Sequence, residues 1–118
     1  YKQGGRVMGQ YHKVYNIDKK EYIEPHEINN GLKLVEQIGF EESTSTALFL
    51  LLANSNGRGG GDVEDHALIG SWAGDRIVIQ GDYAEEGDTG FISDREIDGY
   101  LDISHQVKDM FNHIRESL

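Results

Sequence analysis

The residue types best suited to hold a ligand gather in residues 54–62, which read NSNGRGGGD. Glycines such as Gly60 let backbone amides approach a ligand closely, and Arg58 offers a planar, charged donor fork for a phosphate or a carboxylate. The segment lacks the Gly-Lys-Ser/Thr ending of a P-loop, and it is expected to follow a helix, whose C-terminal end repels anions. It is therefore either a turning connection or a binding loop that uses Asn54, Arg58, Gly60 and Asp62.

Three carboxylates and an imidazole come next in the chain, at Asp62, Glu64, Asp65 and His66. Divalent cations accept these ligand types. Such clusters also arise readily in acidic chains, and no other His or Cys lies at a metal-binding spacing from them. Asp62, Asp65 and His66 are thus the candidate metal ligands, while the sequence requires no cofactor.

Trp72, Asp75 and Arg76 are the remaining candidates for binding a ligand or a partner. Trp72 lies between small residues, which suits either a core position or a partly exposed recognition surface. Turn chemistry accounts for Asp75 equally well. If Arg58, Trp72 and Arg76 converge in space, they would surround a nucleotide-like or carboxylate compound.

Acidic side chains are concentrated in one part of the chain, whose formal net charge is −10. Residues 62–102 carry 12 acidic side chains against Arg76 and Arg95, whereas residues 1–20 carry five basic groups and one acidic residue, Asp18. The acidic part would repel a phosphate backbone, so direct nucleic-acid binding is disfavoured. It suits either a solvated surface or one that attracts cations or a basic protein.

Composition bounds the class of protein. The chain has no cysteine, which excludes disulfides and thiolate chemistry and favours a reducing, cytoplasmic setting, or the host cytoplasm for a viral protein. The longest apolar run, residues 47–53, is too short to span a bilayer, so no membrane segment is predicted. The 118 residues suit one domain, expected over residues 8–118 from a natural start at Met8, with residues 1–7 as an upstream leader.

The candidate residues are expected on an α+β scaffold. Tyrosines and β-branched residues predict four strands, at residues 11–17, 21–24, 67–72 and 76–80. Apolar spacing and cap residues predict two helices, at residues 47–53 and from Asp102 or Ser104 to the C-terminus. Residues 32–38 fit either a short helix or a buried strand. The prediction is a small antiparallel sheet covered by two or three helices.

Four sequence blocks together carry a resemblance to a group of short uncharacterised proteins from bacteria, archaea and their viruses. The blocks are residues 13–26 (KVYNIDKKEYI-x-PH), 31–34 (GLKL), 51–62 (LLAN-x-NGRGGGD) and 70–83 (GSWAGDRIVI-x-GDY). The resemblance implies a prokaryotic or viral intracellular protein. It implies no catalytic or binding residue, because the group has no established activity.

Three functions from different classes remain open. The favoured one is a non-enzymatic, acidic protein that binds a protein partner through the glycine-rich loop and the acidic surface, for instance as a viral or mobile-element inhibitor. The second is a small-ligand-binding module at the glycine-rich loop. The third is a metal-dependent hydrolase in which His26 or His66 acts as the base with Asp62 or Asp75. The sequence also leaves homo-oligomerisation open.

Overall fold

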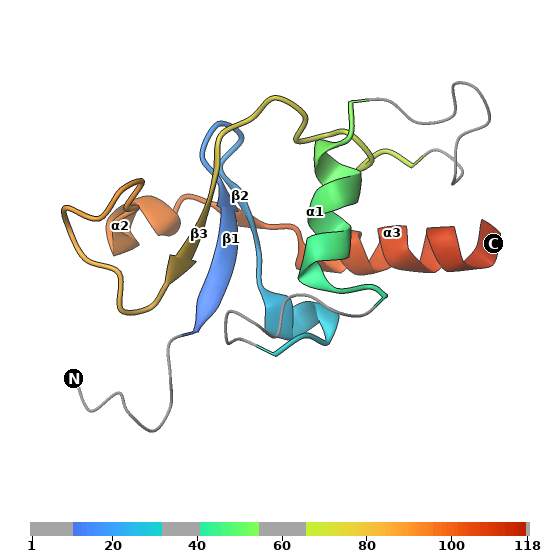
Figure 1. Ribbon diagram of the computed structural model, residues 1–118, viewed down its shortest axis with the longest axis horizontal. Helices are drawn as coiled ribbons and strands as arrows, with labels where there is room; N and C mark the ends of the chain where they lie inside the picture. The colour runs from blue at the N-terminus through green and yellow to red at the C-terminus, as the bar shows by residue number, and fades with distance from the viewer. Residues whose placement is uncertain (1–10, 32–40, 55–65, 118) are drawn as a thin grey trace.

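The computed structural model describes residues 11–31, 41–54 and 66–117, and these form an α+β fold, as the sequence predicts (Figure 1). The strands are β1 (His12–Asn16), β2 (Glu21–Ile23), β3 (Ile77–Gly81) and β4 (Leu101–Asp102). The helices are α1 (Thr44–Leu52), α2 (Asp94–Ile97) and α3 (Ser104–Ser117), with a 3-10 helix, η1 (Pro25–Ile28), after β2. The element predicted at residues 32–38 lies outside the described residues.

The four strands form one sheet in the order β3-β1-β2-β4. Strand β1 pairs antiparallel with β2, where Tyr15 faces Tyr22, and with β3, where Val14 faces Ile79. Strand β4 pairs with β2 in parallel, so the sheet is mixed and not wholly antiparallel as predicted. The sequence gives no signal for this pairing, because a two-residue strand has no alternating pattern of its own. The chain crosses from one edge of the sheet to the other between β3 and β4.

Residues 67–72 form turns, and the strand predicted there is wrong. Gly70 has a φ of +82°, which an extended strand does not allow. The backbone amides of Gly70 and Trp72 donate to the carbonyls of Leu50 and Leu51, both over 2.9 Å. The last turn of a helix leaves such carbonyls without a helical partner. The segment therefore closes the C-terminal end of α1, a long-range interaction that local propensity does not predict.

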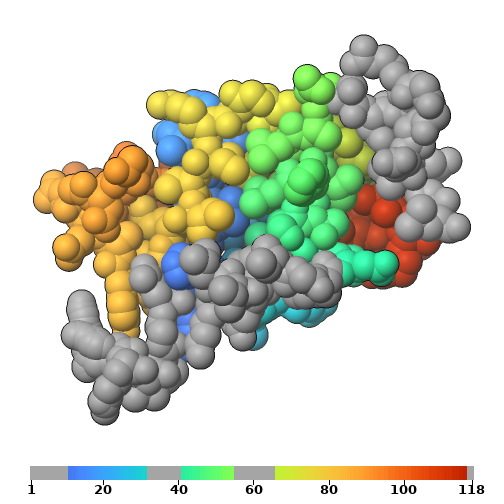
Figure 2. All heavy atoms as spheres, in the orientation of Figure 1, coloured from blue at the N-terminus to red at the C-terminus, as the bar shows by residue number. Residues whose placement is uncertain are grey.

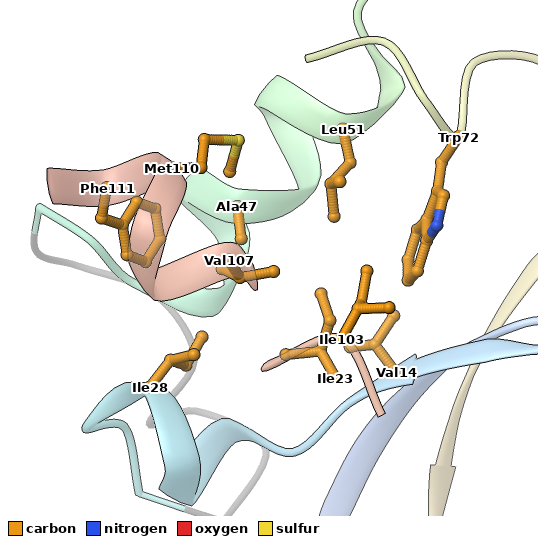
Figure 3. Close-up of a cluster of buried hydrophobic side chains, with 10 residues drawn as sticks. All are labelled: Val14, Ile23, Ile28, Ala47, Leu51, Trp72, Ile103, Val107, Met110 and Phe111. Atoms are coloured by element: carbon orange, nitrogen blue, oxygen red, sulfur yellow. The ribbon is translucent and has the colours of Figure 1, made fainter. Parts of the chain in front are cut away.

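Helices α1 and α3 pack against one face of the sheet and enclose the core (Figure 3). Helix α1 begins where Ser43 Oγ accepts a hydrogen bond from Thr46 N over 3.2 Å. Helix α3 contributes buried side chains at i, i+3 and i+4. The core side chains are Val14, Ile23, Ile28, Ala47, Leu51, Trp72, Ile103, Val107, Met110 and Phe111. None of the helices in the described ranges has the length and apolar character needed to cross a membrane.

Candidate functional site

Most of the glycine-rich loop lies outside the residues that the structure describes. Arg58, Gly60, Asp62 and Asp65 lie outside the described residues, so their predicted roles stay predictions. Asn54 is described, and it is exposed just beyond the end of α1. The candidate residues that the structure does place are Asn54, His66, Trp72, Asp75 and Arg76, together with the candidate base His26, which is exposed in η1.

Trp72 is a core residue. Its side chain is 0% exposed, and its indole Nε1 donates to Glu21 Oε1 over 2.7 Å. Of the two roles that the sequence allows, the structure shows the core position. The surrounding turn segment is thereby fastened to strand β2.

Asp75 and Arg76 belong to a polar network where β3 meets the turn between β1 and β2. The Arg76 guanidinium donates to Asp18 Oδ1 over 3.0 and 2.7 Å, and this hydrogen bond lowers the pKa of the Asp18 carboxyl. Asp75 Oδ2 accepts from Lys19 Nζ over 2.7 Å and from the buried Asn16 amide over 2.9 Å. The Lys19 ammonium and then the Asn16 amide lower the pKa of Asp75. These side chains link the residues before β3 to the β1–β2 turn.

His66 lies beside His113, with 5.2 Å between the ring centroids. His66 Nδ1 accepts a hydrogen bond from Leu68 N over 3.1 Å. In the neutral ring the proton then sits on Nε2, which as a donor offers no lone pair to a metal ion. No group of three His, Cys, Asp or Glu side chains is placed for a metal among the residues that the structure describes. Because Asp62 and Asp65 lie outside them, the predicted metal site stays a prediction.

A cleft of about 660 Å³ opens on the sheet face opposite the core. Side chains alternate along a strand, so the buried Val14 places Lys13 and Tyr15 of β1 on the outer face. The far wall comes from α2 and the segment before it, which lie in the orange part of the ribbon in Figure 1. The lining residues are Tyr11, Lys13, Tyr15, Glu24, Gln80, Gly81, Asp82, Ala84, Phe91, Ser93, Asp94 and Ile97. This volume lies within the range of ligand pockets, about 300 to 1,000 Å³.

Gln80 fastens the far wall of this outer cleft to the sheet. Its Nε2 donates to the Ile92 carbonyl and its Oε1 accepts from the Ile92 amide, both over 2.8 Å. Helix α2 starts directly afterwards with a capping box, in which Ser93 Oγ accepts from Glu96 N. The Ser93 backbone amide in turn donates to the Glu96 carboxylate and lowers its pKa. The wall is thus built by specific bonds to β3.

Lys13 and Glu24 form an ion pair inside the outer cleft, with Lys13 Nζ 3.1 Å from Glu24 Oε1. The same ammonium lies 5.7 Å from the centre of the Tyr22 ring. Burial acts to lower the pKa of Lys13, but the hydrogen bond and charge of Glu24 outweigh burial, and the pKa is raised. The outer cleft therefore already binds one ammonium group between a carboxylate and an aromatic ring.

Tyr15 is the buried floor of the outer cleft. Its ring stacks on Tyr22 with 5.6 Å between centroids and meets the edge of Tyr100 at 5.9 Å. Burial raises the pKa of Tyr15 above the ordinary tyrosine value of about 10, so its hydroxyl stays protonated into the alkaline range. Aromatic faces beside carboxylates are the environment that guanidinium and alkylammonium groups favour.

Sequence reasoning did not identify the outer cleft, although it identified the acidic stretch that supplies part of its wall. Tyr11 N donates to Asp82 Oδ1 over 3.1 Å, across 71 positions of sequence. The sequence feature that could have indicated this cleft is the alternation of Tyr11, Lys13 and Tyr15, which places two aromatic side chains and an ammonium group on one face of the strand. Their pairing with β3 could not be read from spacing.

Comparison of the chain with protein-family models, with curated proteins and with solved structures finds no match. The predicted relationship to short prokaryotic and viral proteins accordingly stays a prediction.

Proposed function

We propose that this chain is a protein-binding module whose outer cleft accepts a basic side chain of a partner protein. One observation carries the proposal. The outer cleft holds the Lys13 ammonium against Glu24 and Tyr22, and two further carboxylates, Asp82 and Asp94, line the same cleft. Among the described residues Lys13–Glu24 is the single ion pair there, so neither Asp82 nor Asp94 has a cationic side-chain partner in this part of the chain.

The surroundings of the outer cleft add to this attraction. Residues 82–102 carry eight carboxylates and one basic residue, Arg95. Figure 2 shows the orange part of this segment forming one end of the molecule, away from the red helix α3. A surface of one sign steers partners of the opposite sign and raises their association rate, an effect that salt screens. A basic partner is therefore favoured over an acidic or nucleic-acid one.

The test uses a short, fluorescently labelled oligo-arginine peptide, with an oligo-glutamate peptide of the same length as the negative probe. We expect saturable binding of the arginine peptide alone, with an affinity that falls as salt is added. The double variant Asp82→Asn, Asp94→Asn should weaken binding at least about tenfold, which corresponds to about 1.4 kcal/mol. Asn at position 82 can still accept the hydrogen bond from Tyr11 N, so the fold is preserved.

The matched control is Asp109→Asn, Glu116→Gln, which removes the same charge from exposed positions on α3, outside the outer cleft. It should lower the affinity only slightly. If both double variants weaken binding equally, the peptide recognises net charge alone and the outer cleft is not its site. Absence of saturable binding in the wild-type protein would also contradict the proposal.

A further inference from the structure

Strand β3 is the last strand at one side of the sheet, and no described strand pairs with its outer edge. Asp82 N donates to the Tyr11 carbonyl over 2.8 Å, and Ile17 N donates to the Arg76 carbonyl over 2.9 Å. In an antiparallel pair the backbone groups of alternate residues face the partner strand. The even-numbered residues of this stretch thus bond to β1, while the amides and carbonyls of Ile77 and Ile79 point outward.

The open edge lacks the usual protection against pairing with another strand. Proteins commonly block an edge strand with lysine, proline or a bulge. The five residues of β3 read IVIQG and include no charge and no proline. The Ile79 side chain is 47% exposed, because the helices that cover the rest of the core face do not reach it. Burying Ile79 against an apolar partner would be favourable.

We infer that this edge pairs with the same edge of a second copy of the chain, antiparallel and centred on Ile79. In this register Ile79 faces Ile79 of the other copy, and the two exchange both backbone hydrogen bonds. Arg76 of each copy then lies opposite Asp82 of the other, on one face of the joined sheet. The strand is therefore self-complementary in charge, and the two four-stranded sheets become one continuous sheet.

The ends of β3 are compatible with this register. Gly81 would face Ile77 of the second copy, and glycine leaves room for the isoleucine side chain. The Gly81 carbonyl already accepts from Ala84 N over 3.1 Å, but a carbonyl oxygen has a second lone pair for another donor. Arg76 is exposed and can keep its bonds to Asp18 while it meets Asp82 of the other copy. Charge pairs of this kind fix register more than they add affinity.

The experiment is sedimentation equilibrium and light scattering of the full chain over a wide concentration range. We expect a monomer–dimer equilibrium. Ile79→Pro removes only an outward amide, because residue 79 does not donate to β1, and proline is tolerated on a strand edge whose amide faces away. Its dimer dissociation constant should rise at least about tenfold, a change of about 1.4 kcal/mol. The matched control Ile79→Val keeps the amide and the strand propensity and should still dimerise.

A second variant keeps the test decisive if Ile79→Pro disturbs the fold. Ile79→Lys retains the amide but places a charge at the centre of the pairing, and it should also give monomers. Phe49→Lys changes another exposed apolar residue, on α1, and should leave the dimer intact. A dimer that is lost in Phe49→Lys and kept in the Ile79 variants would overturn the inference and place the interface on α1.

Asp82 lines the outer cleft and also faces Arg76 of the second copy in the dimer, so the two proposals share one carboxylate, and salt separates them. Each copy carries a net charge of −10, so screening should strengthen the dimer, whereas it should weaken peptide binding in the outer cleft. Hydrogen exchange provides the last check. The Ile77 and Ile79 amides should exchange slowly only at concentrations where the dimer forms. A wild-type chain that is monomeric throughout, or slow exchange of these amides in the monomer, would overturn the inference.

Discussion

The indole Nε1 of Trp72 donates a hydrogen bond of 2.7 Å to Oε1 of Glu21, and this bond joins the turns after α1 to strand β2. Trp72 is fully buried at one side of the core, on the right in Figure 3, near Leu51 and Val14. A buried donor needs a partner, because losing one leaves the desolvation cost of the N–H group uncompensated. The carboxylate at position 21 is thus a structural element of the sheet.

Glu21→Ala should reduce the free energy of unfolding by about 1–3 kcal/mol, since it leaves the Trp72 N–H without its acceptor. Glu21→Gln is the matched control and should lose less, because the amide oxygen still accepts. Urea unfolding followed by fluorescence measures both, and the signal is unambiguous because Trp72 is the single tryptophan. Equal losses in the two variants would show that this hydrogen bond contributes little.

Gly70 and Gly74 provide a matched pair for a steric prediction. Both have positive φ, +82° and +81°, so alanine is strained at either position. A Cβ at Gly70 would lie 2.7 Å from the Ala53 carbonyl oxygen, whereas one at Gly74 would meet nothing within 4 Å. Gly70→Ala should therefore be less stable than Gly74→Ala by at least about 1 kcal/mol. Thermal unfolding compares them, and similar midpoints would contradict the close approach.

Acid should destabilise the polar network at the β1–β2 turn. Hydrogen bonds from Arg76 and Lys19 lower the pKa values of Asp18 and Asp75 in the folded state. Their contribution to stability is present above the unfolded carboxyl pKa, about 3.9, and is lost as pH falls through the lower folded values. Asp75→Asn should make stability less dependent on pH below about 5. Stability measured from about pH 2 to 7 for the wild-type protein and this variant checks it, and identical profiles would contradict the prediction.

Alkali should ionise Tyr15 of the outer cleft and its ring neighbours Tyr22 and Tyr100 late. Burial raises the pKa values of Tyr15, Tyr22 and Tyr100, so the folded state holds these protons more tightly than the unfolded chain. The resulting stability is complete below the unfolded pKa of about 10 and is lost as pH rises through the folded values. Absorbance titration should show a late phenolate phase whose amplitude falls in Tyr15→Phe. An unchanged late phase would place Tyr15 among the early-titrating groups.

The elements that the sequence predicts well are those with a pattern of their own. Alternation located the strand at residues 11–17, observed at His12–Asn16, and apolar spacing located the C-terminal helix that begins at Ser104. The helix predicted at residues 47–53 begins earlier, at Thr44, because Ser43 rather than a later hydroxyl is its cap. The choice among consecutive Ser and Thr residues depends on geometry that propensity does not contain.

The parts that the sequence did not predict depend on distant partners. The turns at residues 67–72 are held by backbone hydrogen bonds to the end of α1, and β4 forms because it pairs with the edge of β2. The outer cleft likewise needs Lys13 and Glu24 from one end of the chain and Asp82 and Asp94 from the other. The clustering of acidic residues in the sequence indicated an acidic surface. The position of the cleft on that surface follows only from the pairing of β1 with β3.

The sheet order also has a consequence for the chain as it is synthesised. Strand β1 lies in the interior of the sheet, yet of its two neighbours only β2 follows it directly, while β3 is made some 60 positions later, as the pairing of Asn16 with Ile77 shows. Until then a ribosome-bound chain presents the β1–β2 hairpin with one edge of β1 unpaired. Such intermediates aggregate readily. We expect nascent chains to depend on chaperones most strongly in the interval between the emergence of β2 and that of β3.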